Sequence, residues 1–292
     1  MPRFSTLLRR GKPMPDPEPI FPYGHFYSPI VDPASLSGND ALFAPRQTLA
    51  GIDFRPELHT QILREWFPKF LPDYDYPDEG DIHEPTSYFH NNDQFSWLDA
   101  RALYVILRQL RPRSIIEVGS GFSSLLIADV VRRYLSDSRF TCIEPYPRAF
   151  LRRGIPGVTE LKIAKAEHVP PTTFEQLVAG DVLFIDSSHV CKTGSDVNFL
   201  FFDVLPRLAS GVVIHVHDIF LPLEYPKAWV IDENRSWNEQ YLLQALLMFS
   251  TRFEVLFGCA YAATFLGHDV VAALNRPDGH GMGGGSFWLR VR

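Results

Sequence analysis

The sequence predicts an α/β protein with a doubly wound, mostly parallel sheet of seven strands that ends in an antiparallel C-terminal strand. From Arg113 onward, short apolar runs rich in β-branched residues alternate with segments of helical periodicity. This alternation is typical of βαβ units in a sheet that is covered on both faces. The last two apolar runs, FEVLFG and SFWLRVR, have no convincing helix between them. Strands joined without a crossover helix normally pair antiparallel.

The expected domain organisation is an N-terminal extension over residues 1–95 and a Rossmann-like domain over residues 96–292. Many of the 24 prolines fall in the first part, which predicts an irregular and helical arm or lid. Within it, residues 56–71 have the apolar spacing of an amphipathic helix. A second helix is expected to begin near Ser96, with the Ser96 side chain as its cap and Asp99 in its first turn.

The remaining elements follow in alternation. The expected helices cover about 123–135, 146–153, 172–178, 195–208 and 237–250, the last with Ser236 as its cap and with Asn238 and Glu239 facing either the pocket or solvent. The expected strands are SIIEVG, FTCIEP, VTELKIAK, DVLFIDSS, GVVIHVHD, FEVLFG and SFWLRVR.

Composition argues against several classes of protein. The net charge is -6 and no basic block is longer than a pair of residues, which argues against nucleic acid as a partner. The three cysteines lie far apart, so neither a disulfide framework nor a cysteine metal site is expected, and the protein is assigned to a reducing cytoplasm. No apolar run approaches the ~18 residues of a membrane span. The sequence leaves open whether the chain forms a homo-oligomer.

A glycine loop follows the first strand directly and opens a helix, in the segment EVGSGFSS. Gly119 and Gly121 allow a tight turn and let a ligand lie against the backbone. Glu144, at the end of the next strand, can accept hydrogen bonds from ribose hydroxyls. A pyrophosphate-binding loop favours a third glycine, where this chain has Ser124. Glu117 instead suits a cofactor that carries an amino-acid group and no phosphate.

Two further strands end in acids and histidines. Asp186, Ser187 and His189 follow the strand DVLFIDSS, and GVVIHVHD ends in a His-Val-His-Asp run. Carboxyl ends of neighbouring parallel strands meet at one sheet edge, so these groups are expected to face one crevice. Imidazoles and carboxylates there could bind a divalent metal or act as acid and base, whereas histidines satisfied within a polar cleft are the alternative. The second run is His215, His217 and Asp218, with both histidines on one sheet face.

The segments EVGSGFSS, CIEP, DVLFIDSSHVCKTGSDVNFLFFDVLPRLASGVVIHVHDIF and WNEQYLLQALL together resemble bacterial class I S-adenosylmethionine-dependent methyltransferases of the methyltransferase 24 type. The resemblance covers roughly residues 90–258. It implies that the glycine loop brackets the methionine part of S-adenosylmethionine and that Glu144 holds the ribose. The expected cofactor-binding residues are Glu117, Gly119, Ser120, Gly121, Ser123, Glu144, Asp186 and Ser187.

The resemblance extends to related catechol-type O-methyltransferases, which bind magnesium at the same sheet edge. Asp186, His189 and Asp218 match three elements of that site, whereas Ile219 stands where those enzymes have Asn. His217 could supply the missing ligand. The expected ligands of magnesium or another divalent metal are therefore Asp186, His217 and Asp218.

These resemblances imply transfer of a methyl group to a small-molecule acceptor in small-molecule metabolism, with O-methylation favoured. His189 is expected to act as the general base, with Asp186 and Asp218 orienting it or a metal. The aromatic N-terminal segment and the stretch FLPLEYPKAW are expected to cover the acceptor. The residues expected to contact the acceptor are Tyr27, His189, His215 and Asn238.

Three alternatives stay open at this point. The protein could bind S-adenosylmethionine but cyclise or eliminate its aminobutyrate arm, because a fold does not dictate a reaction. It could be a non-catalytic binding protein that keeps the fold. A nicotinamide-dependent dehydrogenase is a weaker candidate.

Overall fold

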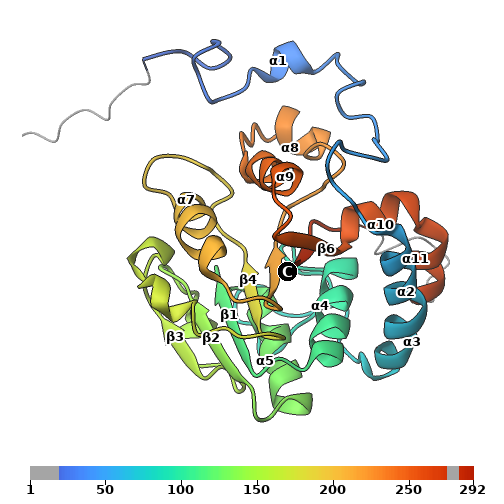
Figure 1. Cartoon of the computed structure of the whole chain (residues 1–292). Coiled ribbons are helices and arrows are strands. Elements are labelled where there is room, and N and C mark those ends of the chain that lie inside the picture. Colours follow the sequence, from blue (N-terminus) through green and yellow to red (C-terminus); the bar gives the residue numbers. More distant parts are fainter. Residues whose placement is uncertain (1–19, 275–282) are drawn as a thin grey trace, which may run out of the picture.

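The computed structural model describes residues 20–274 and 283–292, so the first 19 residues of the expected arm and part of the glycine-rich segment GHGMGGGS lie outside the described residues. One seven-stranded sheet runs through the molecule, with the strand order β3-β2-β1-β4-β5-β7-β6 (Figure 1). This confirms the predicted doubly wound sheet. The strands are β1 Ser114–Val118, β2 Arg139–Ile143, β3 Glu160–Lys162, β4 Val182–Ile185, β5 Val213–Val216, β6 Phe253–Gly258 and β7 Phe287–Val291.

The last strand lies between β5 and β6 and runs antiparallel to both, as predicted. The reason given for that prediction was wrong, because two helices lie between β6 and β7. They are α10 (Cys259–Phe265) and α11 (Gly267–Leu274). Both segments contain several alanines, and alanine has the highest helix propensity. The prediction gave more weight to the glycines that follow them.

Most of the other helices lie where periodicity placed them. The segment predicted as a helix over 172–178 forms only a 3-10 turn at Pro171–Thr173, because consecutive prolines set the backbone there and the next strand already begins at Val182. The helix predicted after Ser236 begins at Glu239, and the Ser236 hydroxyl accepts from the Val31 amide (3.2 Å) instead of capping it. The observed helices are α5 Phe122–Tyr134, α6 Ala149–Arg152, α7 Asp196–Phe199 with its continuation to Arg207, α8 Lys227–Ile231 and α9 Glu239–Phe249.

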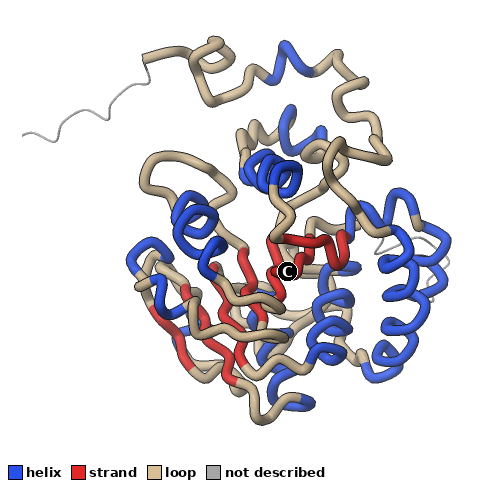
Figure 2. Tube along the Cα trace, in the orientation of Figure 1, coloured by secondary structure: helices blue, strands red, loops and turns tan. Residues whose placement is uncertain are grey.

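The N-terminal part is largely loop before residue 55, helical over 56–73 and loop again up to residue 96 (Figure 2). The predicted helix over 56–71 is present as a succession of short helical segments. Next, α4 (Trp97–Leu110) follows Ser96 as predicted, but the Ser96 hydroxyl donates to the Asn92 carbonyl (2.6 Å) and does not cap the helix. The other segments are α1 Pro33–Leu36, α2 Pro56–Gln61, a π-helical turn Ile62–Trp66, α3 Phe67–Phe70 and a 3-10 turn Leu71–Asp73.

Both faces of the sheet are buried, which explains why its strands are continuously apolar. Neighbouring residues of β4 show this. Phe184 packs on one face with the helices α2 to α5, and Leu183 packs on the opposite face with α7 and α9. Consequently, the sheet edges and the carboxyl ends of the strands are the places where polar side chains can meet a ligand. No helix within residues 20–274 and 283–292 is long and apolar enough to cross a membrane.

At the opposite end of the sheet, one carboxylate ties β1 to β4. Asp181 is 3% exposed and accepts three backbone N–H groups, from Arg113 (3.0 Å), Ser114 (2.8 Å) and Val178 (3.0 Å). Each buried N–H left without a partner costs about 1–3 kcal/mol.

We therefore predict that Asp181→Ala lowers the free energy of unfolding by about 3 kcal/mol or more, measured by urea denaturation. Asp181→Asn keeps an acceptor oxygen for one pair of amides, so its free energy of unfolding should fall by less. Asp137→Ala, at an exposed position, is the control and should change stability by less than about 0.5 kcal/mol. Equal losses for the Asp181→Ala and Asp137→Ala proteins would contradict the role of Asp181.

Candidate active site

Three cavities meet at the carboxyl ends of β1, β4 and β5. The large cavity, of about 850 Å³, lies between the start of α4 and the segment after β5. The side cavity, of about 390 Å³, lies between Glu144 and the segment after β4. The loop cavity, of about 230 Å³, lies over the glycine loop Gly119–Ser123. Asp186 lines all three, so it stands at their junction.

The glycine loop crosses the backbone of the segment after β4 at very close range. Gly119 has a φ of +78°, and a Cβ atom at this position would lie 1.8 Å from the Asp186 carbonyl oxygen. In return, the Asp186 amide donates to the Val118 carbonyl (2.8 Å). Only glycine fits here, and the contact fixes the position of Asp186 relative to the loop.

Glu117 lies behind the loop and does not line any of the three cavities. It is completely buried, and its carboxylate accepts from the hydroxyls of Ser123 (2.7 Å) and Ser124 in the first turn of α5. Burial raises the pKa of Glu117 to about 7, against the opposing effect of these hydrogen bonds. The expected direct contact of Glu117 with a ligand is thus replaced by a positioning role, in which Glu117 anchors the helix that the loop opens.

Glu144 stands at the end of β2, where the sequence predicted it. Its carboxylate accepts from the amides of Ser120 (3.1 Å) and Tyr146 (2.7 Å) and lines both the side cavity and the loop cavity. A carboxylate has about four acceptor positions, so Glu144 retains acceptor capacity toward a ligand in these cavities.

His189 lies among three carboxylates. Its Nε2 is 3.4 Å from Asp186 Oδ1 and 3.5 Å from Asp218 Oδ2, and its Nδ1 is 3.0 Å from Glu239 Oε2. Burial alone would lower the pKa of His189, but the hydrogen bonds and charges of Asp186 and Glu239 raise it to about 10. At neutral pH this ring therefore holds its proton and donates, so in this arrangement it is not the general base that the sequence predicted.

The same groups converge closely enough to hold a metal ion. One ligand atom from each of Asp186, His189 and Asp218 lies within 4.8 Å of the others. His217 was expected in this set in place of His189. Its Nε2 lies 3.6 Å from Asp218 Oδ1, but it does not belong to this converging group. Two carboxylate oxygens and an imidazole nitrogen suit a divalent transition metal.

The backbone is strained where these side chains originate. Trp97, His189 and Asp218 have φ values of 54°, 60° and 54°, a region that side chains other than glycine rarely occupy. Such outliers persist only where the surroundings impose them, and they gather at functional sites. Here all three residues stand at or beside the large cavity.

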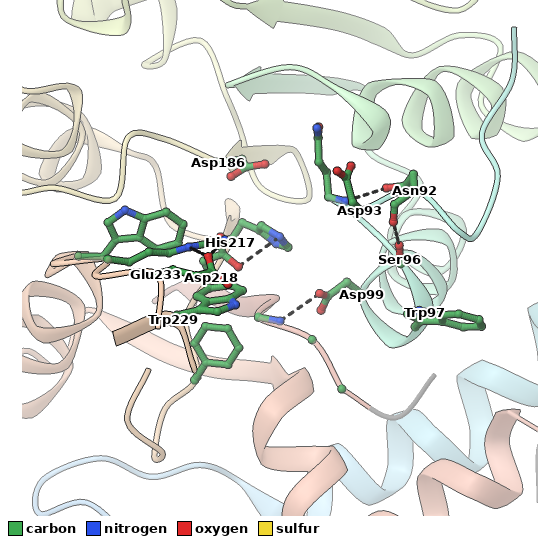
Figure 3. Close-up of a pocket in the computed structure, with 17 residues that line it drawn as sticks. Asn92, Asp93, Ser96, Trp97, Asp99, Asp186, His217, Asp218, Trp229 and Glu233 are labelled. Carbon is green, nitrogen blue, oxygen red and sulfur yellow. Dashed lines mark hydrogen bonds and ion pairs between the residues drawn. The ribbon is translucent and has the colours of Figure 1, made fainter. Parts of the chain in front are cut away.

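The start of α4 is joined to the end of the sheet through Asp99. Its carboxylate accepts from the amides of Gly285 (3.0 Å) and Ser286 (2.8 Å), and the Gly285 carbonyl accepts from the Ile219 amide (2.8 Å). A Cβ atom at Gly284 would lie 2.2 Å from Asp99 Oδ1. The chain entering β7 thus closes one wall of the large cavity, and its glycines permit the approach (Figure 3).

A profile described as a methyltransferase domain matches residues 116–219, from β1 to just beyond β5. An uncharacterised protein of Archaeoglobus fulgidus is 38% identical over 157 residues, which cover 52% of this chain and 70% of that protein. The chain belongs to the class I S-adenosylmethionine-dependent methyltransferases.

Solved methyltransferases are also similar to this methyltransferase. One from Podospora anserina, with S-adenosylhomocysteine bound, is 16% identical with a TM-score of 0.41, over 80% of this chain and 88% of that one. An O-methyltransferase of Bacillus cereus, also in complex with S-adenosylhomocysteine, is 14% identical with a TM-score of 0.40, over 80% and 91% of the two chains.

Several residues predicted to contact the acceptor of this methyltransferase lie elsewhere. His215 is completely buried, stacks on Phe184 (3.8 Å between ring centroids) and contacts the Ser286 hydroxyl (2.9 Å). Tyr27 is 67% exposed, in an aromatic group of the N-terminal segment. Asn238 accepts from the Cys191 amide (2.6 Å) and so supports the segment after His189. None of these three lines the large cavity of the methyltransferase.

Other residues of the methyltransferase site were missed. Glu239 was left undecided, although an acid in the first turn of a helix that follows the strand-end cluster was a usable signal. The segment FLPLEYPKAW does reach the large cavity, through Phe220 and Trp229. The remaining lining residues were not singled out from the sequence; they include Trp97, Glu233, Arg235 and Trp237.

The raised pKa of Glu117 predicts a pH-dependent stability. Because the folded state binds this proton more tightly than the unfolded state, the contribution is complete below about pH 4.5 and is lost as pH rises through about 7. We predict that Glu117→Gln removes this dependence, so the stability of the variant relative to wild type rises by up to about 3 kcal/mol between pH 4.5 and 8. Urea denaturation at several pH values measures it. Curves that stay parallel for the two proteins would refute the assignment, and exposed Glu57→Gln is the control.

Proposed function

We propose that this protein transfers the methyl group of S-adenosylmethionine to a small-molecule acceptor. The observation that carries the proposal is the position of Asp186 at the junction of the three cavities. A cofactor in the side and loop cavities and an acceptor in the large cavity would meet at this carboxylate. Methyl transfer needs this kind of arrangement, because donor and acceptor must be aligned in line and shielded from water.

The residues around the two smaller cavities fit S-adenosylmethionine. Glu144 offers acceptor oxygens for ribose hydroxyls, and Gly119 and Gly121 leave backbone open to a ligand. Arg148 also lines the loop cavity and would meet the carboxylate of the methionine part. The hydroxyl of Ser187 donates to Glu239 (3.0 Å), so we assign it a supporting role beside the cofactor.

The acceptor side favours methylation of oxygen. Burial raises the pKa of Asp186, but the charge of His217 and the hydrogen bond from His189 outweigh it, and the net pKa lies below the ordinary value. Asp186 is therefore ionised and can orient or accept a hydroxyl proton, while protonated His189 holds Asp186 and Asp218 in place. A divalent metal held by Asp186, His189 and Asp218 would lower the pKa of an acceptor hydroxyl. The net charge of -6 and the acidic lining of the large cavity favour a small metabolite as acceptor over nucleic acid or membrane, and we assign the protein to the cytoplasm.

We predict that calorimetric titration of EDTA-treated protein with S-adenosylhomocysteine gives micromolar binding. Glu144→Ala should weaken it at least tenfold, which corresponds to about 1.4 kcal/mol, because the ribose hydroxyls lose their acceptor. Glu144→Gln keeps one acceptor oxygen, so its affinity should lie between those of wild type and Glu144→Ala. Glu175→Ala, on the rim of neither small cavity, is the control. The proposed function fails if wild-type protein binds neither S-adenosylhomocysteine nor S-adenosylmethionine, with or without added metal.

We further predict that Mg²⁺, Mn²⁺, Zn²⁺ or Fe²⁺ binds the protein without cofactor, and that binding is lost in His189→Gln and Asp218→Asn. His217→Gln should keep it, because His217 lies outside the converging group. Calorimetry with each metal alone measures this. Loss in His217→Gln with retention in His189→Gln would restore the ligand set expected from sequence, and absence of binding by wild type would remove the metal from the proposal.

A further inference from the structure

We propose that the acceptor carries a guanidinium or ammonium group, which binds in the large cavity at a subsite formed by Trp229, Trp237 and Glu233. In the structure the side chain of Arg235 fills this subsite. The inference rests on the proposed function, because it names the chemical class of molecule that enters the same cavity.

The subsite is an aromatic corner with a carboxylate beside it. The ring centroids of Trp229 and Trp237 lie 5.4 Å apart and the angle between the ring planes is 76°, so the two faces are nearly perpendicular. The guanidinium carbon of Arg235 lies 4.1 Å from the centroid of Trp229 and 4.7 Å from that of Trp237. Its Nε and Nη2 donate to Glu233 Oε2 (2.6 and 2.5 Å). Indole faces and a carboxylate are the groups that recognise cations, and here they already hold one.

The charge around the cavity favours a cation over an anion. Among the described residues, the lining holds five carboxylates against the guanidinium of Arg235 and the imidazole of His217, and protonated His189 lies behind Asp186 and Asp218, so negative charge is still in excess. A concave site with an excess of one sign of charge concentrates ligands of the opposite sign. Arg235 is itself neutralised by Glu233, so it is a poor receptor for a carboxylate ligand. The five carboxylates are Asp93, Asp99, Asp186, Asp218 and Glu233.

The subsite lies beside the reacting centre but is separate from it. The Trp237 ring is 4.3 Å from the ring of His189, which in turn contacts Asp186. A cation on the indole corner therefore places a different part of the same molecule at Asp186. A protonated nitrogen has no lone pair to receive a methyl group, so under the proposed O-methylation the acceptor atom is a hydroxyl oxygen some bonds away from the charge. The acceptor class is an amino or guanidino alcohol or phenol.

Arg235 can vacate the subsite without disturbing the core. Its side chain is 33% exposed, and it belongs to the loop between α8 and α9. Replacing it with a shorter neutral residue should leave the two indoles and Glu233 free for an external cation. A matched pair of probes isolates the charge, because butylguanidinium and butylurea have nearly the same shape and differ by one positive charge.

The test is calorimetric titration of both probes into wild type and Arg235→Gln. We expect Arg235→Gln to bind butylguanidinium at least fivefold more tightly than wild type, and butylurea equally weakly in both proteins. Adding Glu233→Gln to Arg235→Gln should abolish this gain in affinity. Adding Trp229→Phe, which keeps an aromatic face, should reduce the gain only in part. Arg207→Gln, which removes an exposed arginine outside the cavity lining, is the control and should behave as wild type.

Two results would overturn the inference. One is equal affinity of Arg235→Gln for butylguanidinium and butylurea. The other is binding of pentanoate to wild type that disappears in Arg235→Gln, which would make Arg235 an anion receptor. Titration of S-adenosylhomocysteine into the same preparations separates the two proposals. Cofactor binding without cation selectivity overturns only the acceptor class, and cation selectivity without cofactor binding overturns the proposed function and leaves a cation site with no acceptor role.

Discussion

The contact between Gly119 and the backbone carbonyl of Asp186 is the constraint on which the site depends. At this distance there is no room for a Cβ atom, so the loop after β1 and the segment after β4 are locked together. That lock puts Asp186 at the junction of the three cavities and brings the glycine loop against the same residue. Glu117 reinforces the arrangement from below, because it holds the first turn of α5 through two serine hydroxyls. The glycine loop and the large cavity are therefore parts of one rigid unit.

A second constraint is the sharing of one buried imidazole by three carboxylates. Glu239 is completely buried and Asp186 and Asp218 are partly so, at 31% and 15% exposure of their side chains. Carboxylates so close together repel each other unless a cation lies among them. Protonated His189 meets this need in the absence of metal. A divalent metal held by Asp186, His189 and Asp218 would bring two positive charges in place of the single charge of the imidazolium and would replace its Nε2 proton.

Sequence predicted the scaffold better than the acceptor site, for a physical reason. Strands, the glycine loop and the acids at strand ends leave local patterns, so Glu144, Asp186 and Asp218 were placed correctly at one sheet edge. Roles that depend on how side chains pack in three dimensions leave no local pattern in the sequence. Glu117 looked like a ligand residue because its burial by Ser123 and Ser124 is not visible in one dimension. His215 and His217 share a face as alternation predicted, yet Phe184 covers only His215. The helices α10 and α11 were not predicted, because the glycine-rich segment that follows them is typical of a loop.

The walls of the large cavity come from parts of the chain with different freedom to change. Its floor, at Asp99, Asp186 and Asp218, is fixed by backbone hydrogen bonds, close glycine contacts and the strained φ of Asp218. Its outer wall, at Trp229, Glu233, Arg235 and Trp237, belongs to the segment between β5 and α9, outside the regular sheet. Loops on a rigid scaffold tolerate substitution far better than the elements they connect. Under the proposed function, the chemistry would therefore belong to the floor, and the choice of acceptor to the aromatic and charged residues of the outer wall.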